Sequence, residues 1–299
     1  MSFASDIKEN LCRIDDDKKC CKLSQLVAMV CFLGKYDGNR LKIKTENEAV
    51  ALCLSELLSG YIKSDEFLYS APNNQSSMHS IVINDKNTIT SLANAFILDI
   101  SKKTLLPNKS LYEKECCKTA FLRGAFLGSG SVSDPSKNYH AEFVTSSAPL
   151  ADMLYELLLS EQIGAKITVR KNNFVVYIKD SEAIASLLGF MGAGMSMMEF
   201  YNIKIEREVR NNVNRQVNCD NANLDKITLA AQKQISAIRK IENTIGFDTL
   251  APTLKEIAAL RIENPEMSLK ELGFLLTPPI SKSGVNHRLD KICEIADKI

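Results

Sequence analysis

The chain of 299 residues is 45% hydrophobic and 24% charged, and its net charge is +1. This length accommodates two modest domains, and this composition excludes a chain that is disordered throughout. The balanced charge also excludes a general attraction to nucleic acids or anionic membranes, so any electrostatic binding surface must be local.

The N-terminal segment, Met1 to Leu11, is mixed and amphipathic, without the apolar core of a signal peptide. The sequence has no run of about 18 apolar residues, which is the length that a membrane-spanning helix needs. We therefore expect a cytoplasmic, nucleoid-associated protein without a membrane partner.

The 9 cysteines include two adjacent pairs, Cys20-Cys21 and Cys116-Cys117. Neighbours on a helix point about 100° apart, so neither pair is a natural disulfide. No C-x-x-C pair and no zinc-finger spacing occurs. We expect free thiols that pack as small hydrophobic groups, and we predict no metal ligand and no cofactor.

The first two thirds of the chain repeat themselves. At an offset of 100 positions Glu56-Leu57-Leu58 recurs as Glu156-Leu157-Leu158, and at an offset of 95 Ser91-Leu92 recurs as Ser186-Leu187. A loop of different length explains the change in offset. The pattern predicts a duplicated domain over residues 1–195, with repeats at about 20–105 and 115–190.

Each repeat is predicted to be an α-β-α-β-β-α unit, which gives an α+β domain. The final helices begin after Asp85 and Asp180, two plausible N-caps. In the order of one repeat, with the first copy before the second, the predicted elements are helices at 23–33 and 119–127, strands at 41–44 and 139–144, and helices at 47–58 and 148–159. Strand pairs follow at 66–69 with 80–83 and at 166–170 with 174–178.

The first helix of the second repeat is apolar nearly all round and carries Gly124 and Gly128 one turn apart. Glycine inside a helix costs about 1 kcal/mol, so it needs a compensating reason. Close crossing of two helices is such a reason. An offset of 96 places Ala28 opposite Gly124 and Gly34 opposite Gly130, so we expect the two first helices to pack across a pseudo-two-fold axis.

Duplicated units with paired glycine-bearing helices resemble the LAGLIDADG homing endonucleases. In that family the helix ends in an acid that binds the catalytic divalent metal, but Ser129 and Leu33 stand at those places here. Neither side chain supplies an anionic oxygen, so we predict no catalytic residue and no enzyme. An active metal-dependent endonuclease would need Asp37 and Asp134 as shifted acids, which we interpret instead as turn residues.

The next segment, residues 196–224, is predicted to be a linker helix followed by an asparagine-rich polar hinge over 211–223. Another long helix is expected from about Leu224 to Thr244. Basic residues outnumber acids here, so Arg210, Arg215 and Lys226 are candidate contacts to DNA phosphates. The alternative is a solvated helix face.

The last segment, residues 225–299, is predicted to be an all-α DNA-binding domain with a helix-turn-helix at about 268–299. A short helix at 254–262 ends before Pro265. Ser268 and Glu271 form a capping box for a helix that extends to about Leu276, where prolines stop it. Ser281 is expected to cap the final helix, which extends to the end of the chain.

The final helix has two sides. A stripe of Val285, Leu289, Ile292 and Ala296 is expected to be packed. Its polar residues suit phosphates and base edges, particularly near the helix N-terminus. We predict DNA contacts from Ser281, Lys282, Ser283, Asn286, His287, Arg288 and Lys291. The alternative is a polar surface helix in a structural bundle.

The whole chain resembles the WhiA family. Three stretches carry the resemblance: Leu122-Arg-Gly-Ala-Phe-Leu-Gly-Ser-Gly-Ser131, Val213-Asn-Arg-Gln-Val-Asn-Cys-Asp-Asn-Ala-Asn-Leu-Asp-Lys226 and Ile280-Ser-Lys-Ser-Gly-Val-Asn-His-Arg-Leu289. The resemblance implies a degenerate homing-endonuclease domain joined to a helix-turn-helix. It also implies roles in transcription control, sporulation, cell division and chromosome segregation.

The expected function is therefore that of a sequence-specific binder of double-stranded DNA, with other transcription or division proteins as further partners. Two alternatives compete with it: a metal-dependent endonuclease, and a scaffold that docks another protein on the duplicated domain. The histidines His79, His140 and His287 have no neighbouring nucleophile and acid at recognisable spacing, so we predict no catalytic role for them.

Overall fold

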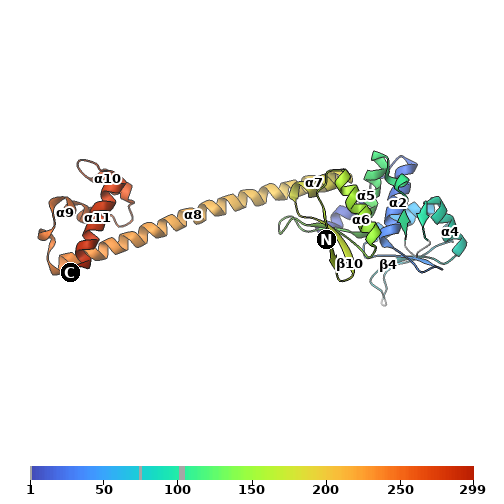
Figure 1. The fold of residues 1–299 in the computed structure, drawn as a ribbon, viewed down its shortest axis with the longest axis horizontal. Coiled ribbons are helices and arrows are strands. Elements are labelled where there is room, and N and C mark those ends of the chain that lie inside the picture. The colour runs from blue at the N-terminus through green and yellow to red at the C-terminus, as the bar shows by residue number, and fades with distance from the viewer. Residues whose placement is uncertain (1, 74–75, 101–104) are drawn as a thin grey trace. The chain divides into compact units, whose positions relative to one another are not determined.

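The computed structural model describes residues 2–73, 76–100 and 105–299 (Figure 1). Its contacts divide the chain into two units, Met1–Arg207 and Glu208–Ile299. None of the described helices combines the length and the apolarity that crossing a membrane requires.

The first unit contains two copies of one arrangement, which confirms the predicted duplication. Each copy has a four-stranded antiparallel sheet, ordered β1-β2-β4-β3 in the first and β7-β8-β10-β9 in the second. The first copy consists of α2 (Lys19–Leu33), β1 (Gly34–Tyr36), β2 (Leu41–Thr45), α3 (Glu48–Ser59), β3 (Leu68–Ser70), β4 (His79–Ile83) and α4 (Lys86–Ala95). The second consists of α5 (Glu115–Ser129), β7 (Gly130–Val132), β8 (Ala141–Thr145), α6 (Ala148–Ser160), β9 (Lys166–Arg170), β10 (Asn173–Ile178) and α7 (Ser181–Phe190).

The predicted order of elements within each copy was wrong in one respect, because a strand follows the first helix directly. β1 and β7 have three residues each and begin at the residue after α2 and α5. Such short strands give no readable alternation of polar and apolar residues. The unit is therefore α-β-β-α-β-β-α. The predicted caps are confirmed, since the Asp85 and Asp180 carboxylates accept hydrogen bonds from the Thr88 and Ala183 amides.

The central helices α2 and α5 lie side by side and belong to one hydrophobic core that includes both copies (Figure 1). Their contact explains the glycines of α5. A β-carbon at Gly124 would stand 2.3 Å from the carbonyl oxygen of Gln25 and 2.8 Å from the Ala28 β-carbon. At Gly128 it would stand 2.8 Å from the Phe32 β-carbon. The expected close crossing of the two helices is confirmed.

Arg123 of α5 is buried and joins several segments of the first unit. Its Nη1 donates to Asp16 Oδ2 at 2.8 Å and to Gln25 Oε1 at 3.0 Å. Its Nε donates to the Met191 carbonyl at 3.0 Å. A buried guanidinium is tolerated only when such partners replace water. Sequence reasoning missed this role because it depends on residues distant along the chain.

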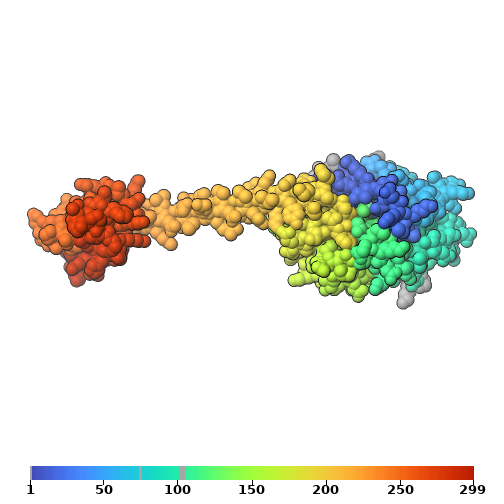
Figure 2. Space-filling model, turned by 90° about the horizontal axis from the view of Figure 1, so that it is seen from above, coloured from blue at the N-terminus to red at the C-terminus, as the bar shows by residue number. Residues whose placement is uncertain are grey.

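The N-terminal helix α1 (Phe3–Cys12) lies on the surface beside the start of α8 (Figure 2). The Asn10 side-chain amide donates to the Ser196 hydroxyl at 3.2 Å. The rings of Phe3 and Phe200 are 6.5 Å apart between centroids. Two short strands, β5 (Leu98–Asp99) and β6 (Leu106–Pro107), and a 3₁₀ turn (Lys109–Tyr112) connect the copies.

The predicted polar hinge at 211–223 does not exist in the structure, because one helix, α8 (Gly194–Thr244), contains it. No glycine or proline occurs between Gly194 and Gly246. Asparagine disfavours a helix interior by roughly 0.7 kcal/mol, which is less than glycine and far less than proline. The asparagines therefore lower helix stability without ending the helix.

The second unit is all-α, with its core formed by the last turns of α8 and three further helices. These are α9 (Pro252–Glu263), α10 (Leu269–Leu275) and α11 (Lys282–Asp297), and a 3₁₀ turn (Phe247–Thr249) precedes them. The core includes Ile238 and Ile241 of α8 and Ile257 of α9, all fully buried. Lys240 of α8 also donates to the Ala296 carbonyl at 2.9 Å.

Candidate nucleic-acid interface

The helix-turn-helix of the second unit is built from locally capped helices. Ser268 and Glu271 form the predicted capping box: the Ser268 amide donates to the Glu271 carboxylate at 2.8 Å, and the Glu271 amide donates to the Ser268 hydroxyl at 3.3 Å. This hydrogen bonding lowers the pKa of the Glu271 carboxyl. The capping box thereby stabilises the first turn of α10.

The turn between α10 and α11 folds back tightly onto α10. The Ile280 amide donates to the Gly273 carbonyl at 3.0 Å. A β-carbon at Gly273 would stand 2.4 Å from the Ile280 carbonyl oxygen. Only glycine leaves room for the returning backbone at this point. Ser281 then caps α11, accepting a hydrogen bond from the Gly284 amide at 3.3 Å.

The two sides of α11 are as predicted. Val285, Leu289 and Ile292 are fully buried, and Ala296 is 2% exposed. Ser283, His287 and Lys291 lie opposite this stripe, Lys282 and Asn286 flank it, and all five are exposed. The structure therefore presents the polar residues of the N-terminal turns together on one accessible surface. We call these five residues with Ser281 and Arg288 the α11 surface.

Asn286 and Arg288 of the α11 surface already have protein partners. Asn286 Nδ2 donates to Asp290 Oδ2 at 2.6 Å. Arg288 is half-buried, and its Nη1 lies 3.4 Å from the Thr253 carbonyl oxygen. Both contacts lie on the exposed surface of α11. Reading a base with either side chain would require it to exchange a weak surface contact for a base edge.

A buried arginine contacts the loop between α9 and α10. Arg261 of α9 is 1% exposed, and its Nη1 donates to the Met267 carbonyl at 2.7 Å. Burial lowers the pKa of this guanidinium. The bond ties α9 to the loop that leads into the capping box of α10.

The candidate phosphate contacts on α8 do not form one cluster. Arg210, Arg215 and Lys226 are all exposed. Arg215 and Lys226 are about three helical turns apart and share a side of the helix. Arg210 lies on a different side. The spacing along a continuous helix thus places Arg215 and Lys226 on one side and Arg210 on another.

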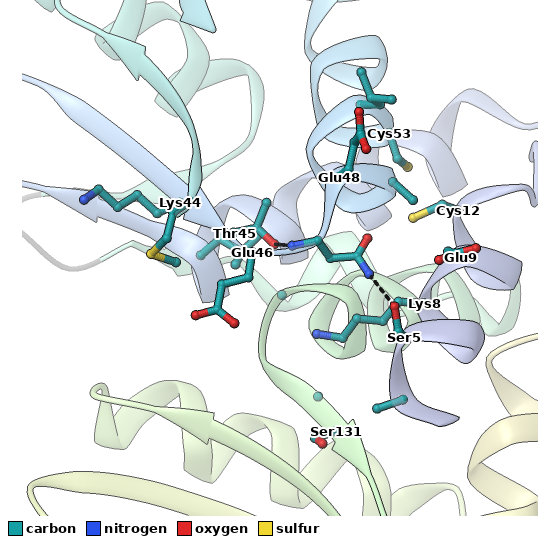
Figure 3. A pocket seen from close by; sticks show the side chains of 18 of the residues that line it. Ser5, Lys8, Glu9, Cys12, Lys44, Thr45, Glu46, Glu48, Cys53 and Ser131 are labelled. Atoms are coloured by element: carbon teal, nitrogen blue, oxygen red, sulfur yellow. Dashed lines mark hydrogen bonds between the residues drawn. The ribbon is translucent and has the colours of Figure 1, made fainter. Parts of the chain in front are cut away.

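In the first unit, the ends of the paired helices lack the acids of a LAGLIDADG nuclease. The Ser129 hydroxyl donates to the Ala125 carbonyl at 3.0 Å, within its own helix. A groove of about 990 Å³ opens here (Figure 3). Leu33, Gly128 and Gly130 are among the residues that line it. Lys8 of α1 also lines the groove, and burial lowers the pKa of its ammonium group.

The alternative acids Asp37 and Asp134 belong to hairpin turns. Asp37 Oδ1 accepts from the Asn39 and Arg40 amides at 3.0 and 2.9 Å, and its Oδ2 accepts from the Arg40 guanidinium at 2.8 Å. Backbone hydrogen bonds, together with Arg40, hold the pKa of Asp37 at about 2. Asp134 Oδ1 accepts from the Ser136 amide and hydroxyl. These contacts are those of turn residues.

Within the described ranges, one group of three or more His, Cys, Asp or Glu side chains is close enough to share a metal ion. It consists of cysteines rather than carboxylates. The groove at the helix ends therefore holds no cluster of acids among the described residues, although Glu9, Glu46 and Glu48 line it (Figure 3).

Comparisons with known proteins cover both units. Residues 118–210 match the family described as the WhiA LAGLIDADG-like domain, and residues 213–296 match the WhiA C-terminal HTH domain. The probable cell division protein WhiA of Lachnoclostridium phytofermentans is 41% identical over 309 residues, covering 99% of each chain. The relative of that name in Clostridium perfringens is 39% identical, covering 100% of this chain and 98% of its own.

A solved structure agrees with this fold. The crystal structure of full-length DUF199/WhiA from Thermatoga maritima aligns with a TM-score of 0.59 and 24% identity, over 100% of this chain and 99% of that chain. The predicted fold class, a duplicated LAGLIDADG-like α+β domain followed by an all-α helix-turn-helix domain, is confirmed. With relatives of about 40% identity over their full length and a helix-turn-helix domain that indicates DNA binding, the chain belongs to the WhiA family.

Proposed function

We propose that this chain is a sequence-specific DNA-binding protein that regulates transcription in cell division, chromosome segregation and sporulation. The observation that carries the DNA-binding part is the two-sided packing of α11, whose aliphatic stripe is buried while its polar N-terminal turns are exposed. The name of the curated relatives, probable cell division protein, supports the cellular role. Binding to chromosomal DNA would place the protein on the nucleoid.

The α11 surface contains the groups that a recognition helix uses. The N-terminal turn of a helix carries free amides and a partial positive charge, and both favour a nearby phosphate. Lys282 and Ser283 lie in this turn, where they suit a phosphate or a base edge. His287 and Lys291 follow on the solvent side of the next turns. We therefore place the start of α11 in the major groove, with Arg288 and Asn286 as candidate readers of guanine and adenine.

A binding titration against genomic fragments tests this assignment. Fragments bound by the parent chain are first selected by genome-wide mapping, and their affinity is then measured by fluorescence anisotropy against a scrambled duplex. Replacing His287, Arg288 and Lys291 with alanine should remove the preference for the selected fragment. Each lost base contact costs about 1–3 kcal/mol of discrimination.

A matched control separates base reading from general charge. Arg239→Ala with Lys298→Ala also removes two permanent positive charges, as the triple variant does, but from other exposed positions of the same unit. This double variant should bind both duplexes slightly more weakly and keep the preference for the selected fragment. Full retention of the preference by the α11 triple variant would show that another surface reads the sequence.

We also propose that the LAGLIDADG-like domain does not cut DNA. Support comes from Ser129 and Leu33 at the helix ends, from the partly buried Lys8 cation in the groove, and from the turn contacts of Asp37 and Asp134. Incubation of duplexes with Mg²⁺ or Mn²⁺ should give no cleavage above that of buffer. Metal-dependent cutting that disappears in Asp37→Asn or Asp134→Asn would overturn this proposal.

A further inference from the structure

Four cysteines meet where α2 and α5 begin. Cys20 and Cys21 are the second and third residues of α2, and Cys116 and Cys117 are the second and third residues of α5. The same offset of 96 positions that relates the two helices relates the two cysteine pairs. The four Sγ atoms all lie within 4.8 Å of one another. The duplication thus brings together two pairs that are distant in sequence.

The four thiols form a compact group at the edge of the first unit. Cys21 and Cys117 are buried, at 3% and 4% exposure, and with Ala120 they form a small apolar cluster separate from the main core. Cys20 and Cys116 retain contact with solvent, so a small ion could enter from their side. The Cys116 and Cys117 Sγ atoms are 4.0 Å apart, and the Cys21 thiol donates to the Cys116 carbonyl oxygen at 3.4 Å.

Both cysteine pairs lie beside helix N-termini and among lysine side chains. Both pairs lie in the first turn of a helix, where the backbone amides stabilise anions. Several lysines flank the pairs. Lys22 is paired with Asp15 and Lys118 with Glu115 and Glu161.

We propose that Cys20, Cys21, Cys116 and Cys117 bind one zinc ion as a tetrathiolate site that joins the two copies of the duplicated domain. Tetrahedral zinc with Zn–S bonds of about 2.3 Å holds its sulfurs roughly 3.8 Å apart. The thiols already lie within 4.8 Å of one another, so rotamer adjustments of about 1 Å would complete the site. Thiolates are soft ligands, and among mononuclear sites they favour zinc and copper(I).

The four cysteine ligands indicate a structural zinc site rather than a catalytic one. Four protein sulfurs leave no open position for water or substrate, which is the pattern of closed zinc sites. Each thiol that binds gives up its proton, and the two helix N-termini offset part of the net negative charge of the filled site. Because the ligands come from both copies, zinc would bind the folded first unit more tightly than the unfolded chain. It should therefore stabilise the packing of α2 against α5.

Metal content and spectroscopy of the full-length chain test the proposal. Chain purified in reducing buffer and reconstituted with zinc should contain about one ion per chain by mass spectrometry. Cobalt(II) should give the intense visible bands of tetrahedral thiolate coordination. Cys20→Ser with Cys116→Ser, which removes the two ligands nearest solvent, should weaken zinc binding at least about ten-fold. Cys219→Ser is the matched control, because Cys219 is an exposed thiol of the second unit.

A second variant keeps the test decisive if the double variant misfolds. Cys20→His retains a ligand of zinc while changing one sulfur to nitrogen, so it should keep the ion and shift the cobalt spectrum. Three results would overturn the proposal: no zinc in the reconstituted parent chain, equal zinc affinity in the Cys20/Cys116 double variant, or a disulfide between the copies in reducing buffer. A parent chain that instead takes up an iron–sulfur cluster would also contradict a single-ion site.

Discussion

Gly124 lies so close to Gln25 of the paired helix that a β-carbon on Gly124 would stand 2.3 Å from the Gln25 carbonyl oxygen. No β-carbon tolerates that distance from a backbone atom, so the two helices must separate if a methyl group is added. The contact is made twice along the pair, since Gly128 approaches Phe32 in the same way. The packing of the two copies therefore depends on glycine at these positions.

Gly124→Ala should destabilise the first unit by about 2 kcal/mol or more, the cost of overpacking a rigid contact. The alanine gains helix propensity worth up to about 1 kcal/mol, which only partly offsets that loss. Urea unfolding monitored by circular dichroism measures the difference. Gly164→Ala is the control, because a β-carbon at Gly164 meets nothing within 4 Å. Equal stability of the two variants would contradict the close crossing.

Arg123→Ala should destabilise the first unit by about 3 kcal/mol, because it leaves the Met191 carbonyl and the Gln25 side chain without their buried donor. Arg123→Lys should recover little, since one ammonium group cannot reach three acceptors in the fork geometry of a guanidinium. Arg40→Ala provides the comparison: its pair with Asp37 is exposed, and its loss should change the unfolding free energy by less than about 1 kcal/mol. A small effect of Arg123→Ala would show that water replaces its bonds.

The Asp37 turn predicts a dependence of stability on pH. Its pKa is held at about 2, below the ordinary value of 3.8, so the ionised form stabilises the folded state. A lowered folded-state pKa gives stabilisation that is complete above about pH 4 and lost as the pH falls towards 2. The stability difference between the parent chain and Asp37→Asn should therefore shrink across this window in acid unfolding experiments. A constant difference from pH 5 to pH 2 would show that the charge contributes nothing.

Arg215 and Lys226 share a side of α8, which predicts their effect on DNA binding. Replacing both with glutamine should reduce the slope of log Kd against log salt concentration by about 2, one for each phosphate contact, without altering the preferred sequence. Arg210 lies on another side of the helix, so Arg210→Gln should leave the slope within about 0.5 of that of the parent chain. Fluorescence anisotropy at several salt concentrations gives the slopes. If Arg210→Gln alone lowered the slope, the side of α8 that bears Arg210 would be the one that binds DNA.

Much of the fold follows from local sequence patterns. The caps at Asp85, Asp180 and Ser268 each depend on one side chain and a nearby amide, so they can be read without tertiary information. The buried stripe of α11 follows from helical periodicity for the same reason. Gly124 and Gly128 indicate a crossing because glycine has a known cost in a helix, and the internal repeat supplies the partner helix.

The errors lie where local patterns compete or become too short. β1 and β7 have three residues each, and the strand begins at the last turn of a helix, so no alternation marks them. The asparagines at 211–223 favour turns by composition, but without glycine or proline the helix continues through them. The role of Arg123 is not predictable in this way, because its acceptors are distant along the chain.

The cysteine pairs show how much information an internal repeat contains. Taken one at a time, neither Cys20-Cys21 nor Cys116-Cys117 has the spacing of a metal site, and the prediction of no metal ligand depends on that local view. The offset of 96 that aligns Ala28 with Gly124 also aligns the two pairs. Two helices that pack closely at equivalent residues bring their equivalent first turns together as well. The repeat, applied to reactive side chains as well as to glycine, therefore predicts that the four thiols are neighbours.

The pairing of α2 with α5 also sets the order of events during synthesis. The side of α2 that faces α5 is apolar, and its partner begins only at Glu115. While the intervening residues emerge from the ribosome, that side has no native neighbour and is open to premature association. The first copy thus reaches its final packing only after the second copy has started to appear, so this nascent chain should depend on chaperones more than one built from separately folding copies.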